Sequence, residues 1–354
     1  MKRKYLHEDE DGEGEAGCPN EPGLFDTPLR SRDCRPAFSP EDYTVAWVCA
    51  LPLELTAARA VLEEEHSLPA GWNQSHHDDN VYVLGSIAHH KVVMACLPQY
   101  GTNNAAIVAT NLKRSFPNVG VTLMVGIGGG CPSQADLYLG DIVVGTRVMQ
   151  YDMGKVVAGG RFEETAVPKT PGQLLDAAVV SLRSTNGSAL RVPFRNLSRP
   201  RLPDRLFRSS YQHLPSAPTC DSCDPDELLP RPARSSDEPK IHWGVIASGN
   251  RVMKDAAARD DIANRLKALC FEMEAAGIMD NTQCLPIRGI CDYSDSHKNK
   301  DWQKYAAATA AAYAKELLEV LPSRETPGRP AATFSQRSES NGETAVPPCQ
   351  WEAT

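Results

Sequence analysis

The chain has 354 residues, of which 41% are hydrophobic, so it can fold as one large domain or two average ones around a real core. Its net charge of −8, from 45 acidic and 37 basic residues, disfavours a general nucleic-acid binder, which needs surplus Lys and Arg to neutralise phosphates. The eleven scattered cysteines indicate reduced thiols rather than a disulfide framework, and no apolar run approaches membrane-spanning length. We therefore expect a soluble protein of the cytoplasm, or else of the nucleus, with neither a nucleic-acid nor a membrane partner.

Between the two ends of the chain, β-rich runs alternate with helical patterns. The predicted strands cover residues 43–49, 81–87, 91–97, 121–126, 141–149, 241–247, a short run ending at 270–271, and 285–291. The predicted helices cover residues 52–66, 102–115, 254–267, a short stretch near 274–280, and 302–321. This alternation predicts an α/β fold, a three-layer sandwich with a central mixed sheet. In such sheets, ligands bind beyond the carboxyl ends of the strands, so chemistry is expected there.

The composition also divides the chain into segments. Residues 1–41, which contain an acidic run and then much Pro, Gly, Arg and Ser, are predicted to be a disordered leader. Residues 322–354, dominated by Pro, Ser, Thr and Glu, are predicted to be a disordered tail. We expect one domain over 42–321. Within it, residues 185–240 show no clear periodicity and are predicted to form a long surface insertion.

One motif in the insertion concerns metal binding. Cys220 and Cys223 form a Cys-x-x-Cys pair, which is half of a common zinc motif. No second Cys/His pair follows at suitable spacing. We therefore favour a plain loop and predict neither a metal ion nor another cofactor.

The first two strand ends carry an acid and a glycine run. Glu54 lies in the first turn of the helix after the first strand, where an acidic side chain also stabilises the helix dipole. Residues 126–130 (Gly-Ile-Gly-Gly-Gly) let a ligand approach the backbone closely, although a bare tight turn explains them equally well. The run matches neither a dinucleotide-binding fingerprint nor a P-loop, which disfavours nicotinamide and ATPase chemistry.

The last two strand ends carry three more acids. Glu272 and Glu274 lie within three residues, and packing alone explains one of them better than two, because buried acids need hydrogen-bond donors. Sugar hydroxyls are such donors, and one carboxylate can bind two adjacent hydroxyls. Asp292 closes the last apolar strand, where it could serve as a general acid or simply as a turn residue.

Taken in this order, the four strand ends resemble the purine/uridine phosphorylase and nucleosidase superfamily over about residues 43–321. Within it the chain resembles most the methylthioadenosine/S-adenosylhomocysteine nucleosidase branch and the nucleoside-phosphorylase-like domains of filamentous fungi. The segments typical of that fungal group are residues 246–250 (Ile-Ala-Ser-Gly-Asn), 291–300 (Cys-Asp-Tyr-Ser-Asp-Ser-His-Lys-Asn-Lys) and 305–309 (Tyr-Ala-Ala-Ala-Thr). The resemblance implies a nucleoside phosphorylase-like fold, a purine nucleoside or nucleotide as substrate, and a homo-oligomer.

The resemblance also implies roles for individual residues. Glu54 matches the glutamate that activates the attacking water, Glu274 the carboxylate that binds the ribose hydroxyls, and Asp292 the acid that protonates purine N7. The other implied substrate-binding residues are Glu272 and Met273 beside the sugar, Gly128 and Gly129 on the wall of the pocket, Val252 and Met253 against the base, and Asn250 just before them.

Hydrolysis is favoured over phosphorolysis for two reasons. The segment before the glycine run, residues 123–126, lacks the arginine with which the phosphorylases hold phosphate, and the charge of Glu54 would repel that anion. We therefore expect an N-glycosidase acting on a substrate of the adenosine or ATP type. Phosphorolysis stays an alternative, with Arg59 or Arg147 as substitute cation. A nucleotide-binding sensor or signalling module with little catalysis is a further alternative.

The identity of the 5′ substituent depends on weaker signals. Val252 replaces the aromatic that stacks on the purine in the bacterial nucleosidases, which disfavours methylthioadenosine itself. Similar domains in defence proteins include members that depurinate ATP. Residues 151–155 and Arg161 could hold a 5′-phosphate chain, although solvated surface charge is the simpler interpretation.

Overall fold

The computed structural model describes residues 38–68, 72–187, 189–190, 198–234 and 236–323. The predicted leader and tail therefore lie outside the described residues, apart from a few positions at their inner ends. None of the described helices is both long and apolar enough to cross a membrane.

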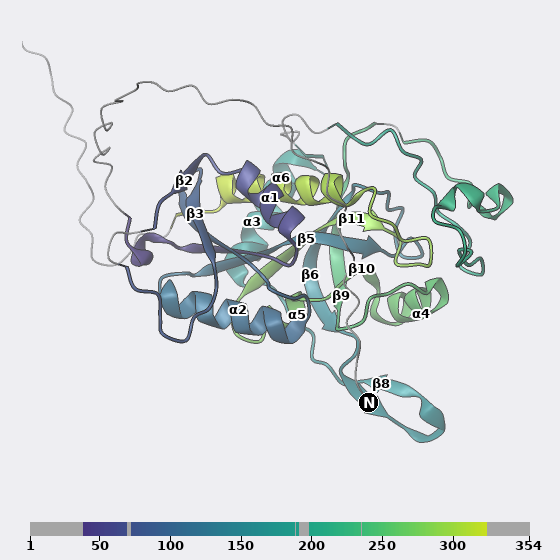
Figure 1. Cartoon of the computed structure of the whole chain (residues 1–354), viewed down its shortest axis with the longest axis horizontal. Coiled ribbons are helices and arrows are strands. Elements are labelled where there is room, and N and C mark those ends of the chain that lie inside the picture. The colour runs from purple at the N-terminus through teal and green to yellow at the C-terminus, as the bar shows by residue number, and fades with distance from the viewer. Residues whose placement is uncertain (1–37, 69–71, 188, 191–197, 235, 324–354) are drawn as a thin grey trace, which may run out of the picture. The chain divides into compact units, whose positions relative to one another are not determined.

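The centre of the domain is a mixed sheet of nine strands, ordered β10-β9-β6-β11-β5-β1-β4-β3-β2 (Figure 1). Their bounds are β1 (Val45–Cys49), β2 (Glu64–His66), β3 (Tyr82–Ile87), β4 (His90–Cys96), β5 (Val121–Gly130), β6 (Ile142–Gln150), β9 (Ile241–Ser248), β10 (Ala268–Glu272) and β11 (Cys284–Asp292). Strand β5 runs parallel to both β1 and β11, and β6 runs antiparallel to β11. The carboxyl ends of β1, β5 and β11 consequently meet at one edge. A separate hairpin joins β7 (Gly154–Val156) to β8 (Phe162–Glu164).

Helices cover both faces of this sheet. The helices are α1 (Pro52–Ala60), α2 (Thr102–Ser115), α3 (Gln173–Asn186), α4 (Ala256–Leu266), α5 (Ala275–Ile278) and α6 (Gln303–Val320). Along β1, Val45 and Trp47 join the core under α1, α3 and α6, whereas Ala46 and Val48 join the core over α2 and α5. This two-residue alternation is the pattern of a strand buried on both faces. Figure 1 shows α1 and α6 on one side of the strands and α2 and α5 on the other.

Strand β5 closes part of the sheet on itself. Beyond its pairing with β11, its last residues pair antiparallel with β10, Gly129 with Phe271 and Gly130 with Cys270. The strands β5, β11, β6, β9 and β10 thereby form a closed ring. The predicted end of this strand at Gly126 was wrong: the glycine run is the end of the strand itself and not a turn after it.

Two other elements differ from expectation. The helix predicted over 52–66 ends at Ala60, and Glu64, Glu65 and His66 form the edge strand β2 against β3. This strand has no apolar alternation, and its pairing with β3 decides its conformation. Helix α3 was not predicted, although Leu175, Ala178, Val179 and Leu182 are buried at helical spacing.

Residues 198–234, which belong to the predicted insertion, contain little regular structure. They form two short 3-10 turns, Cys220–Ser222 and Pro225–Glu227, and one isolated β-bridge between Phe207 and Leu228. Leu206 and Phe207 are nevertheless buried. The boundaries assigned to the domain and to its insertion stay predictions.

Candidate active site

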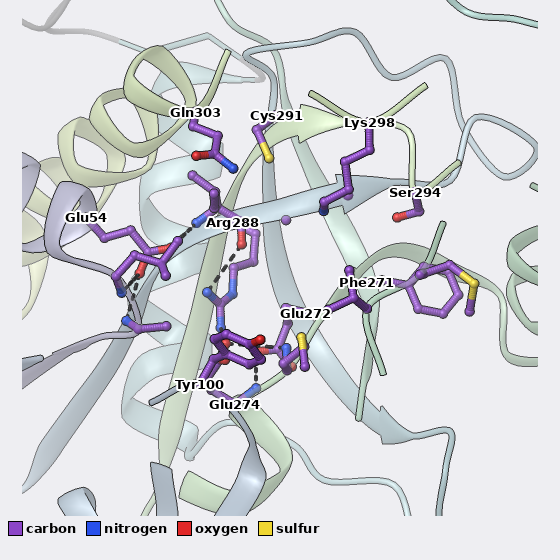
Figure 2. A pocket seen from close by; sticks show the side chains of 18 of the residues that line it. Glu54, Tyr100, Phe271, Glu272, Glu274, Arg288, Cys291, Ser294, Lys298 and Gln303 are labelled. Atoms are coloured by element: carbon purple, nitrogen blue, oxygen red, sulfur yellow. Dashed lines mark hydrogen bonds and ion pairs between the residues drawn. The ribbon is translucent and has the colours of Figure 1, made fainter. Parts of the chain in front are cut away.

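A cavity of about 240 Å³ lies where the carboxyl ends of β1, β5 and β11 meet the end of β10 and the start of α6 (Figure 2). This volume is somewhat below the roughly 300–1,000 Å³ usual for small-molecule pockets. The residues predicted from the sequence that line it are Glu54, Gly128, Gly129, Val252, Met253, Glu272, Met273 and Glu274. Asp292 and Asn250 are absent from the lining, and they are described below.

Glu54 is buried in the first turn of α1 and is held by three backbone amides. Its Oε2 accepts from the amides of Ala50 (2.7 Å) and Leu51 (3.0 Å), and its Oε1 accepts from that of Ile127 (2.8 Å). Burial raises the pKa of this carboxyl, while Arg288 and the three amides oppose the rise. Glu54 therefore fixes the start of its own helix and still faces the cavity. Since a carboxylate oxygen accepts two hydrogen bonds, Oε1 keeps one position for another donor.

Glu272 and Glu274 both contact Arg288, a residue to which the sequence interpretation gave no role. Arg288 on β11 is 1% exposed; its Nη2 forms ion pairs with Oε2 of Glu272 and with Oε2 of Glu274 (3.2 Å). Burial disfavours the charged guanidinium, but Glu272, Glu274 and Glu54 outweigh burial and raise the pKa of Arg288. Among the described residues, the buried Glu272 Oε1 and Arg288 Nε have no hydrogen-bond partner. Two unpaired buried polar atoms beside a cavity indicate a place for a ligand or water.

Glu274 is held by two backbone amides and by Arg288. Its carboxylate accepts from the amides of Gly101 (3.3 Å) and Met273 (3.3 Å) besides Arg288. Burial, together with the charges of Glu272 and Glu54, raises the pKa of Glu274 to about 7, against the opposing effect of Arg288. This acid therefore changes its charge within the physiological pH range.

Asp292 lies behind the rim of the cavity and forms an ion pair with Lys298, which does line it. The Lys298 ammonium is 2.8 Å from Oδ2 of Asp292; Oδ2 also accepts from the thiol of Cys291 (3.1 Å), and Oδ1 accepts from the amide of Ser294 (2.9 Å). Burial lowers the pKa of Lys298, but the charge of Asp292 outweighs it, and the net shift is upward. The carboxyl group and the cavity are thus separated by Lys298 and Ser294.

Two glycines of β5 allow these groups to approach one another. A Cβ at Gly126 would lie 2.7 Å from Arg288 Nη1 and would overlap the carboxylate of Glu54. A Cβ at Gly129 would lie 2.7 Å from Asp292 Oδ1 and would overlap the hydroxyl of Ser294. Any larger residue at either position would displace an acid of the site.

The family model described as "Phosphorylase superfamily" matches residues 44–321. The chain belongs to the phosphorylase superfamily. The resemblance found in the sequence and the predicted fold class are both confirmed. In a crystal structure of 5′-methylthioadenosine/S-adenosylhomocysteine nucleosidase from Neisseria meningitidis, the same fold covers 78% of this chain and 99% of that one, with a TM-score of 0.53 and 20% identity.

Two curated relatives of this phosphorylase superfamily member are larger proteins. A nucleotide-binding leucine-rich repeat (NLR)-like protein of Hyaloscypha variabilis is 42% identical over 81% of this chain and 30% of its own length. An ATP nucleosidase, Cap17, of Escherichia coli is 25% identical over 78% of this chain and 51% of its own length. The chain therefore spans less than a third of the first relative and about half of the second.

Asn250 is not among the residues that line the cavity. Its Oδ1 accepts from the backbone amide of Thr102 (2.9 Å) at the start of α2, and its backbone amide donates to Oδ2 of Asp152 (2.7 Å). Asn250 thereby connects the end of β9 to α2 outside the cavity. Of its neighbours, Val252 is 47% exposed at the cavity mouth, next to Met253.

The basic residues that the sequence offered for binding phosphate do not line the cavity of this superfamily member. Arg59 pairs with Glu65 at the surface, and Arg147 is exposed. Lys155 and Arg161 both pair with Glu163 in the β7–β8 hairpin. Residues 123–126 contain no arginine, but Arg288 reaches the place beside Gly126 from the neighbouring strand. Its charge is, however, already taken up by Glu272 and Glu274.

Proposed function

We propose that this chain hydrolyses the N-glycosidic bond of a purine nucleoside or nucleotide. The observation that carries the proposal is that two buried acids from distant strand ends, Glu54 and Glu274, face one cavity while a third, Asp292, lies behind its rim. The membership of the phosphorylase superfamily supports the same reaction class.

In the proposed reaction each acid has one task. Glu274, as carboxylate, accepts hydrogen bonds from the two ribose hydroxyls. When the purine binds, the ion pair between Asp292 and Lys298 breaks and the Asp292 carboxylate takes up a proton from solvent. Asp292 transfers this proton to N7 of the purine while the C1′–N9 bond breaks and its electron pair leaves with the base. The sugar becomes oxocarbenium-like, and a water held at Oε1 of Glu54 adds to C1′ and gives its proton to that carboxylate.

Water is favoured over phosphate as the nucleophile by the charge of the cavity. Glu54, Glu272 and Glu274 share the guanidinium of Arg288, whose ion pairs with Glu272 and Glu274 are already formed. A phosphate ion near Glu54 would meet uncompensated negative charge in a poorly solvated place. The negative charge of the cavity therefore supports hydrolysis independently of the lack of an arginine in residues 123–126.

Product analysis by chromatography tests the proposal. Purified protein is incubated with adenosine, inosine, methylthioadenosine, AMP and ATP, each with and without inorganic phosphate. Release of free base without phosphate, lost in Glu54→Gln but kept in the exposed control Glu65→Gln, is expected. Release only with phosphate would establish a phosphorylase instead. No release from any substrate would favour a nucleotide-binding module.

The raised pKa of Glu274 predicts a pH dependence of the reaction. Below a pKa of about 7 the carboxyl is neutral and accepts hydroxyl hydrogen bonds poorly, so kcat/KM should fall with decreasing pH, by up to about tenfold per unit. Initial rates between about pH 5.5 and 8 measure this limb. In Glu274→Gln, whose side chain does not titrate, the residual activity should lose the limb. A flat wild-type profile would contradict the assignment.

We propose that the 5′ substituent of the substrate is a phosphate chain. Arg251 lines the cavity and is exposed, with its guanidinium 5.3 Å from the ring of Tyr151 and no acidic partner among the described residues. The ATP nucleosidase relative supports the same choice. We expect Arg251→Ala to lower kcat/KM for ATP by about tenfold or more while leaving adenosine nearly unchanged. Lys155→Ala, in the hairpin outside the cavity, is the control; equal losses for both substrates would count against a phosphate contact.

A further inference from the structure

Three metal-ligating side chains of the insertion converge beside the loop that follows β11. The donor atoms of His213, Cys220 and Cys223 all lie within 4.8 Å of one another. A Zn²⁺ ion bonds thiolate sulfur at about 2.3 Å and imidazole nitrogen at about 2.0 Å, which holds tetrahedral donors roughly 3.5 Å apart. The three side chains therefore need a contraction of little more than about one ångström to share such an ion.

The local backbone explains why the two thiols converge. Cys220 begins a 3-10 turn that Thr219 caps, and the amide of Cys223 donates to the carbonyl of Cys220 (3.2 Å). His213 reaches the pair from seven residues earlier, and its amide donates to the Ser296 hydroxyl (2.9 Å). A search for partners after the Cys-x-x-Cys pair misses this histidine, because it precedes the pair.

The surroundings are those of a binding site rather than of a packed core. Cys220 and His213 are only partly buried, and they border a second cavity, of about 350 Å³, together with His297 and Asp221. The ring of His297 stacks on Phe207 (4.0 Å between centroids) and also contacts Tyr211 (5.5 Å), and its centroid is 5.6 Å from that of His213. Both ring nitrogens of His297 are buried without a hydrogen-bond partner among the described residues. The nearest acid to this ring, Asp295, lies 3.7 Å from its Nδ1, beyond hydrogen-bond distance. A buried imidazole without a hydrogen bond, beside two thiols and a second imidazole, is an independent observation that favours an ion here.

We propose that His213, Cys220 and Cys223 bind a structural zinc ion, with a water molecule or the His297 ring in the fourth position. Thiolate and imidazole ligands together favour Zn²⁺ over Mg²⁺ or Ca²⁺, which prefer oxygen. The ion cross-links a segment that has only short 3-10 turns and one β-bridge of its own.

This zinc site also bears on the candidate active site. Through Ser296, and through the thiol of Cys220 at 3.7 Å from the carbonyl of His297, the ligands contact the residues just before Lys298. Lys298 in turn pairs with Asp292. The ion thus anchors the loop that positions the proposed acid, without touching the substrate.

The test measures metal content and not activity, so it is independent of the proposed reaction. The full chain is purified under reducing conditions without chelator, supplied with Zn²⁺, desalted and analysed by elemental mass spectrometry. We expect about one zinc ion per chain, falling below about one-tenth in Cys220→Ser and Cys223→Ser. Cys96→Ser, at a half-buried thiol outside the cluster, should keep the ion. Replacement by Co²⁺ should give a thiolate charge-transfer band in the same pattern.

Two results would overturn the zinc site. One is wild-type protein that lacks stoichiometric zinc. This result would count against the site whether mass analysis finds Cys220 and Cys223 as free thiols or as a disulfide. The other is zinc retained in both cysteine variants. Should these variants fail to fold, His213→Asn, compared with the exposed control His76→Asn, provides the same comparison: loss of metal supports the site and unchanged metal content contradicts it.

Discussion

Replacing Asp292 by Asn is expected to lower the rate of base release by roughly 10²–10⁴-fold, the usual range for loss of a general acid. The amide keeps the size of the carboxyl and can still bond the amide of Ser294, but it can neither transfer a proton to N7 nor pair with Lys298. KM should change much less than kcat, because Asp292 lies behind the cavity wall. Steady-state kinetics on the best substrate of the product assay measure both.

Two controls distinguish proton transfer from a general disturbance of the loop. Lys300→Met, two residues beyond Lys298 and exposed, should leave the kinetics unchanged. Lys298→Met should lower kcat by disturbing the position of Asp292, but by less than Asp292→Asn does, because the carboxyl itself is kept. Should Asp292→Asn retain wild-type kcat, the proton would have to come from another group, and Lys298 is the nearest one on the cavity wall.

Replacing Arg288 by Met is expected to have the second large effect, this time on stability. The substitution leaves Glu272 and Glu274 buried at 5% and 4% exposure without their cation. Removing one partner of a buried ion pair typically costs about 3–5 kcal/mol in the free energy of unfolding. Urea unfolding followed by fluorescence or circular dichroism measures this loss.

A double variant shows whether charge is the cause. In Arg288→Met with Glu272→Gln, one of the uncompensated charges is gone, so part of the lost stability should return. The surface pair Arg59–Glu65 provides the comparison, since Arg59→Met should cost less than about 1 kcal/mol. A loss of similar size at both arginines would mean that volume, and not charge, governs the effect.

The sequence indicated most of the candidate site because each of its acids ends a strand or comes shortly after one. Glu54 and Glu274 follow β1 and β10, Glu272 is the last residue of β10, and the ends of these strands meet those of β5 and β11 at the cavity. Arg288 was overlooked because it lies inside an apolar strand, where no ligand is expected. Such a position is itself a signal: arginine is almost never fully buried unless paired, and two buried acids precede it in the chain.

Other features depended on contacts that no local pattern specifies. Glu64, Glu65 and His66 read as the end of a helix, and only pairing with β3 makes them a strand. The place of Asn250 outside the cavity follows from its bonds to Thr102 and Asp152, which are distant in sequence. Helix α3 did carry a readable apolar stripe, so its absence from the prediction was an error of interpretation.

The ring of strands that β5 closes has a consequence for the order in which the protein can form. Gly130 pairs with Cys270, and Gly129 lies opposite Asp292. The glycine end of β5 therefore completes its pairing only with strands from the last third of the domain. Contacts this distant in sequence form slowly, because a long loop must close first. During synthesis Glu54 and the glycines emerge long before Glu274, Arg288 and Asp292. A chain that ends before β10 therefore lacks Glu274, Arg288 and Asp292 and can form neither the ring nor the pocket.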